Sequence, residues 1–138
     1  MTNEPQQRLM RQQLEIDALN DHVRRSEFDL EHRTALYGEA VINFCSKLYR
    51  SAVTKPLISQ LVRSACSIGA NYCEADESAT RREFRYRISL CRRESRETKH
   101  WLRMLAAALP AEKERGRSLW KEADELTRIF AAIHRNTE

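Results

Sequence analysis

The stretch TRREFRYRISLCRRESRETKHWLRMLAAAL, residues 80–109, decides the fold class of this 138-residue chain. Its apolar and small residues recur at alternating spacings of four and three positions, the repeat of a helix face buried in a bundle. They are Phe84, Ile88, Cys91, Ser95, Thr98, Leu102, Leu105 and Leu109. Thr80 and Glu83 have the spacing of a capping box, and Pro110 marks the end. We therefore expect one long helix here.

The same spacing recurs on both sides of this helix. It appears over about residues 30–48, in the seam Leu30, Thr34, Tyr37, Val41, Phe44 and Leu48, and again over about 111–135. Residues 56–77 carry two neighbouring seams, the second formed by Val62, Cys66, Gly69 and Cys73. We expect Thr54 to cap that helix, with Pro56 in its first turn, and Gly69 to allow a close helix contact. Because the connections are short, residues 26–138 are predicted to form an all-α, antiparallel up-and-down four-helix bundle.

The composition agrees with long helices and short loops. The chain has only three Gly and three Pro, too few for a collagen-like, linker-like or small β-sandwich protein. Residues 1–25 are predicted to form an additional N-terminal helical extension, because Leu9, Ile16 and Val23 continue a seven-residue spacing. This extension either lengthens the first bundle helix or packs on a partner.

Several kinds of site are not expected. The N-terminus lacks the apolar region of a signal peptide and no apolar run is long enough to span a membrane, so we expect a cytoplasmic protein without a membrane partner. The four cysteines form no CxxC pair and are interpreted as small buried side chains. Glu97 and His100 form one Glu-x-x-His match, whereas a di-metal bundle needs two. We expect no catalytic residues, no metal and no cofactor, and hence no enzyme.

A basic stripe on the long helix is the most informative functional feature. At 100° per residue, six cations fall within about 60° of arc, outside the buried seam, and extend over roughly 33 Å. We call them the Arg ridge: Arg81, Arg85, Arg92, Arg96, Lys99 and Arg103. Arginine predominates in the whole chain as well, with 19 Arg against 5 Lys. Such a ridge suits the phosphates of a nucleic acid, although no stacking aromatic shares its arc. The alternative is a solvated face paired with acids of a neighbouring helix or subunit.

A second apolar stripe on the same helix predicts subunit contacts. It contains Tyr86, Leu90, Trp101 and Met104, which lie on a different face of the helix from the main seam. A bundle helix in a monomer needs one apolar face, so a second face with aromatic residues and Met favours an oligomer interface. The alternative is a wider core contact with the N-terminal segment.

Three stretches carry a family resemblance: FDLEHRTALYGEAVINFC (residues 28–45), KPLISQLVRSACSIGANYCEADES (55–78) and FRYRISLCRRESRETKHWLRML (84–105). The chain resembles the bacterial four-helix-bundle proteins encoded within intervening sequences of the 23S ribosomal RNA gene. The family pattern is carried by Arg63, Asn71 and Glu74. The resemblance implies a ring-like homopentamer and no established activity. A related branch, the accessory proteins of diversity-generating retroelements, implies by analogy a basic surface that binds nucleic acid and a reverse transcriptase.

These observations lead to one principal hypothesis and its alternatives. The principal hypothesis is a non-enzymatic homo-oligomer, pentameric by resemblance, which binds RNA or DNA through the Arg ridge. One alternative is an interaction scaffold whose ridge pairs with acids of neighbouring subunits, and another is an accessory subunit of a reverse transcriptase. Arg63, Asn71 and Glu74 either contact a subunit or nucleic acid, or form polar links inside the bundle, and we favour the polar links.

Overall fold

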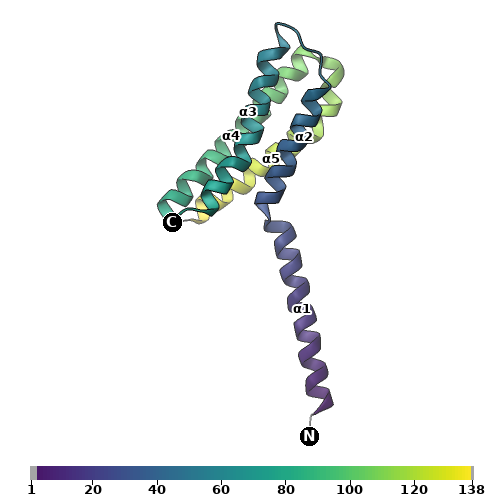
Figure 1. Ribbon diagram of the computed structural model, residues 1–138, viewed down its shortest axis with the longest axis vertical. Helices are drawn as coiled ribbons and strands as arrows, with labels where there is room; N and C mark the ends of the chain where they lie inside the picture. Colours follow the sequence, from purple (N-terminus) through teal and green to yellow (C-terminus); the bar gives the residue numbers. More distant parts are fainter. Residues whose placement is uncertain (1–2, 138) are drawn as a thin grey trace. The chain divides into compact units, whose positions relative to one another are not determined.

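The chain is all-α, as predicted, and has an N-terminal helix before the bundle (Figure 1). The computed structural model describes the backbone of residues 3–137, and their side chains outside residues 19–28. The elements are α1 (Glu4–Phe28), α2 (Leu30–Ser46), α3 (Thr54–Asp76), α4 (Arg81–Ala108), the short 3-10 helix η1 (Pro110–Glu112) and α5 (Lys113–Asn136). The chain divides into two units after Leu30. Its division into domains at residue 25 stays a prediction.

Helices α2 to α5 form the up-and-down bundle, in which each helix lies beside the next (Figure 1). Helix α4 packs along both α3 and α5. The first and last helices of the bundle, α2 and α5, also contact each other. The Tyr37 hydroxyl donates to the Leu119 carbonyl at 2.8 Å, and Arg33 forms ion pairs with Glu122 and Glu125. Helix α4 therefore has neighbours on two sides and leaves a third side to solvent.

The start of α3 is capped by a different residue from the one predicted. Thr54 was expected to cap this end, but the Ser51 hydroxyl accepts the N–H groups of Val53 and Thr54 at 3.2 and 3.1 Å. The Thr54 hydroxyl instead accepts the N–H of Ser51 at 2.8 Å, so the two side chains form a reciprocal capping box. At α4 the predicted box is present: Thr80 accepts the Glu83 N–H at 3.1 Å, and Glu83 accepts the Ala79 N–H.

The predicted seams supply most of the core. The side chains of Val41, Leu61, Ile68, Ile88 and Phe130 are fully buried. The burial predicted for the second seam of α3 is wrong, because Cys66 and Cys73 are exposed and Val62 is only half-buried. That seam lies at the edge of the α2–α3 contact and has no further helix to cover it in the described part of the bundle. Two of the four cysteines are therefore not core residues.

The close approach expected at Gly69 is present. A Cβ at this position would lie 3.2 Å from the Thr34 hydroxyl oxygen on α2, closer than an ordinary contact. Thr34 is buried and its hydroxyl donates to the Glu31 carbonyl, so it has little freedom to move. Gly116 on α5 is different, since its Cβ would meet the Phe44 ring at an ordinary 3.6 Å.

This contrast predicts different effects of two alanine substitutions on stability. Gly116→Ala is expected to raise the free energy of unfolding by about 0.5–1 kcal/mol, because alanine restricts the unfolded chain and favours the helix. Gly69→Ala has the same favourable effect on helix propensity, but crowding of the new methyl group against Thr34 cancels the gain in stability. Urea denaturation of both variants tests this order, and a Gly69→Ala protein as stable as Gly116→Ala would contradict it.

The burial of the cysteines predicts how many of them a thiol-reactive dye will modify. Burial raises the pKa of Cys45 to about 11 and that of Cys91 to about 12, so both thiols stay protonated and covered at pH 8. Cys66 and Cys73 are exposed. A thiol-reactive dye should modify two thiols per native chain and four per unfolded chain. Rapid modification of four native thiols would contradict the described core.

Candidate nucleic-acid interface

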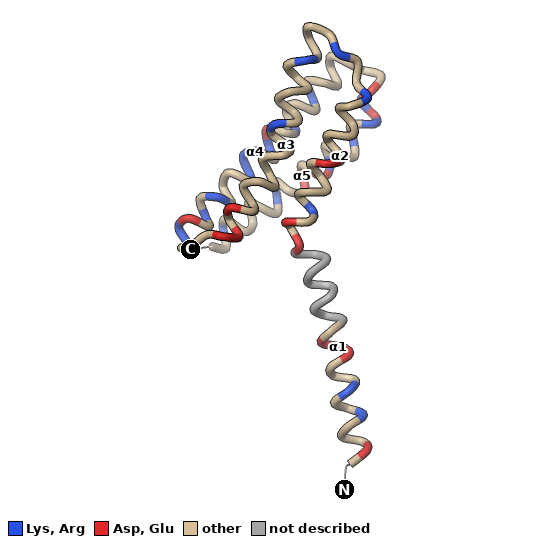
Figure 2. The backbone as a smooth tube through the Cα atoms, viewed as in Figure 1, with Lys and Arg blue, Asp and Glu red and all other residues tan. Residues whose placement is uncertain are grey.

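Helix α4 displays most of the predicted Arg ridge on its solvent side. Arg81, Arg85, Arg92, Arg96 and Arg103 are all exposed, and Figure 2 marks the basic residues of the helix in blue. Among the residues that the structure describes, no carboxylate lies within ion-pair distance of Arg85, Arg92, Arg96 or Arg103. With a rise of about 1.5 Å per residue, these cations follow the helix over roughly 33 Å from Arg81 to Arg103.

Lys99 has a different environment from the rest of the ridge. Its ammonium lies 2.9 Å from the Asp124 carboxylate on α5 and 5.4 Å from the centroid of the Trp120 ring. The hydrogen bond from Lys99 lowers the pKa of Asp124, and Asp124 also pairs with Arg128 at 3.1 Å. Because α5 packs against this position, Lys99 is half-buried and its charge is paired with a carboxylate between α4 and α5. The accessible ridge therefore consists of the five arginines.

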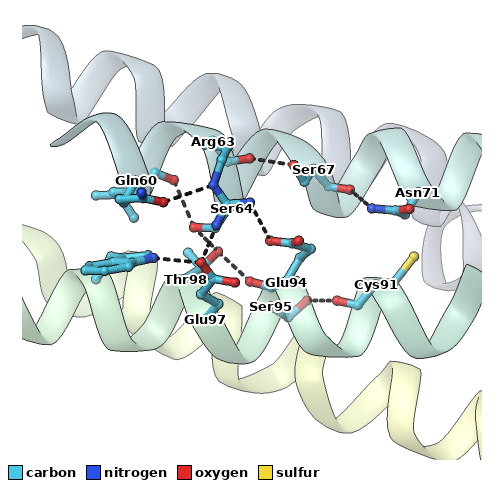
Figure 3. A network of polar contacts seen from close by, with 12 residues as sticks. Gln60, Arg63, Ser64, Ser67, Asn71, Cys91, Glu94, Ser95, Glu97 and Thr98 are labelled. Carbon is cyan, nitrogen blue, oxygen red and sulfur yellow. Dashed lines mark hydrogen bonds and ion pairs between the residues drawn. The ribbon is translucent and has the colours of Figure 1, made fainter. Parts of the chain in front are cut away.

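Two acids of α4, Glu94 and Glu97, point toward α3 (Figure 3). Arg63 on α3 pairs with Glu94 at 3.3 Å and with Glu97, and its Nε donates to Gln60 at 3.0 Å. Burial raises the pKa of Glu94, and the Arg63 guanidinium partly offsets that rise. This network holds two carboxylates on the α3 side of α4, which leaves the arginine side of that helix uniformly positive.

The three residues of the family pattern have different surroundings. Arg63 belongs to the polar network just described, which is the intra-bundle interpretation favoured from the sequence. The Asn71 side chain donates to the Ser67 carbonyl of its own helix at 2.9 Å (Figure 3). Glu74 is exposed, and its backbone carbonyl accepts the Ser78 hydroxyl at 3.1 Å. Arg63 thus links α3 to α4 and Asn71 bonds within α3, and the roles of the three residues stay a prediction.

The second apolar stripe of α4 is only partly covered. Leu90, Trp101 and Met104 are half-buried, and Tyr86 is 58% exposed. The Trp101 indole donates to Glu97 at 3.1 Å and its ring meets His100 edge-on at 5.0 Å between centroids. Their role in an oligomer interface stays a prediction.

Sequence reasoning missed a hollow at the start of α4. Six residues line it: Arg81, Arg82, Arg85, Tyr86, Ser89 and His134. The Arg85 Nε donates to the His134 carbonyl at 3.4 Å, which links the ridge to the last turns of α5. No local sequence signal could place His134 beside α4, because the two segments are far apart in the chain and meet only through the antiparallel packing of α4 and α5.

The cavity and the shifted pKa values of the described residues do not combine into a catalytic site. An apolar cavity of about 330 Å³ lies between α2, α4 and α5, lined by residues that include Phe44, Leu105 and Trp120. The groups with shifted pKa values, such as Cys91 and Glu94, lie elsewhere, in the core or in ion pairs between helices. In the described residues no cluster of side chains is suited to hold a metal ion. None of the described helices combines the length and apolar character that a membrane span requires.

The fold and this surface define an all-α bundle protein with a basic helix face. The chain belongs to the family of 23S rRNA-intervening sequence proteins, whose family model matches residues 32–132. It is similar to the crystal structure of a protein of unknown function from the S23 ribosomal protein family of Bacteroides thetaiotaomicron, with 23% identity and a TM-score of 0.67. The match covers 77% of this chain and 98% of that chain, and it supports the fold alone. No curated protein matches the chain.

Proposed function

We propose that this protein is a non-enzymatic, homo-oligomeric RNA-binding protein that holds phosphates on the Arg ridge. One observation carries the proposal: exposed arginines follow one side of α4 with no described carboxylate paired to Arg85, Arg92, Arg96 or Arg103. Guanidinium groups donate paired hydrogen bonds to phosphate oxygens, and phosphates repeat along a strand as the arginines repeat along the helix.

The charge distribution on α4 favours a ridge that binds a polyanion, and not one that is only solvated. The acids of α4 are engaged elsewhere, so the ridge presents a field of one sign. Neutralisation of several phosphates releases condensed counterions, which makes association favourable at low salt. Repetition of the ridge around a homo-oligomer, a pentamer by family resemblance, multiplies this field.

A direct binding measurement tests the proposal. Fluorescence anisotropy of a labelled RNA of about 20 nucleotides should rise saturably with wild-type protein at low salt and fall back as salt is added. An RNA that stays unbound at low salt would refute the proposed function. Light scattering tests the oligomer separately, with about 81 kDa expected for five chains of 16.2 kDa. A mass of one chain would refute assembly.

The scaffold alternative has one observation in its favour. Lys99 shows that a ridge cation can be neutralised by an acid of a neighbouring helix, here Asp124. If the arginines pair in the same way with acids of another subunit, substituting them will dissociate the oligomer. The RNA-binding proposal expects the same substitutions to leave the solution mass unchanged.

A further inference from the structure

The hollow at the start of α4 adds an aromatic ring to the arginine surface. Tyr86 is 58% exposed, so its ring is accessible to a ligand, and the Arg87 guanidinium lies 5.9 Å from its ring centroid. Arg81, Arg82 and Arg85 line the same hollow, together with the Ser89 hydroxyl. Aromatic and phosphate-binding groups thus meet in one depression of about 500 Å³.

The hollow continues the ridge and widens it. A neighbouring depression shares Arg81 and adds Arg135, Asn136 and Thr137 from the end of α5. Arg135 therefore joins Arg81, Arg82 and Arg85 near the end of the ridge where Tyr86 lies.

These groups fit a single-stranded nucleic acid better than a duplex. A stacking face is useful only to a base whose own face is free, and bases in a duplex are stacked on each other. Guanidinium groups beside that face suit the phosphates on either side of an unpaired nucleotide. A duplex would use the arginines and leave Tyr86 without a function.

We propose that the ridge binds single-stranded RNA, with one unpaired base stacked on Tyr86 and its flanking phosphates held by Arg81, Arg82 and Arg85. This inference rests on the proposed function and specifies its ligand. The strand continues from the hollow along Arg92, Arg96 and Arg103. A tyrosine that holds a base does not serve a subunit contact, so the predicted oligomer interface is left with Leu90, Trp101 and Met104.

Substitutions of Tyr86 test the stacking contact without changing charge. Anisotropy is measured with a labelled 12-nucleotide oligouridine and with a 12-base-pair RNA duplex. Tyr86→Ala should weaken oligouridine binding about tenfold and leave duplex binding unchanged, whereas Tyr86→Phe should retain wild-type affinity because the ring remains. Tyr49→Ala is the matched control, because Tyr49 is 73% exposed and lies outside the hollow. Circular dichroism confirms that each variant is folded.

The outcomes separate this inference from the proposed function. If Tyr86→Ala leaves oligouridine binding unchanged, or weakens single strand and duplex equally, the stacking inference is wrong while RNA binding by the arginines stands. If the wild-type protein binds neither RNA, both proposals are wrong.

Discussion

Charge reversal at Arg85, Arg92 and Arg96 is expected to weaken RNA binding by about 100-fold or more. Each arginine contributes a charge-assisted contact of roughly 1.5–3 kcal/mol, and each introduced glutamate adds repulsion from phosphate. All three residues are exposed and lie between Arg81 and Arg103, so the substitutions affect no buried contact. Anisotropy with a 20-nucleotide RNA at low salt measures the loss.

The matched control reverses the charge of three arginines that lie outside the ridge. Arg8, Arg11 and Arg50 are exposed and lie outside α4. Arg8/Arg11/Arg50→Glu has the same net charge as the ridge variant and should retain RNA affinity within a few-fold. Equal losses in both variants would mean that net charge, and not the ridge, determines binding.

The largest effect on stability is expected for Phe130→Ala. Phe130 on α5 is fully buried and its ring lies 6.1 Å from that of Tyr72 on α3, between centroids. Removing the ring leaves a cavity at the centre of the bundle, which lowers the free energy of unfolding by roughly 3–5 kcal/mol. Urea denaturation followed by circular dichroism at one fixed protein concentration measures this change.

Leu36→Ala is the control for the Phe130 substitution. Leu36 is 50% exposed, so its truncation should lower stability by less than about 1 kcal/mol. Comparable losses at the two positions would contradict the arrangement of the core.

The sequence was sufficient to predict the bundle because its seams are regular. The four-three spacing on α4 predicted Ile88, Cys91, Leu102 and Leu105 as core residues, and all four are buried. The capping box at Thr80 was predicted for the same reason, since its geometry depends only on neighbours in the chain. Features set by a local repeat were therefore predictable.

The errors have a common physical cause in packing between helices. Lys99 shares the ridge arc on a helical wheel, but its neutralisation depends on Asp124, which only the contact of α4 with α5 brings near. Cys66 belongs to a regular apolar seam, yet its exposure depends on the absence of a further helix over that side of the described bundle. The hollow around Tyr86 needed His134 from the end of the chain.

The salt dependence of RNA binding tests the central claim most directly. The logarithm of the association constant falls linearly with the logarithm of salt concentration, and the slope is about −0.7 for each phosphate neutralised on a single strand. Arg85/Arg92/Arg96→Ala removes three such contacts, so the account predicts a slope shallower than that of the wild type by about 2. Parallel slopes for the two proteins would contradict the claim that the Arg ridge binds phosphates.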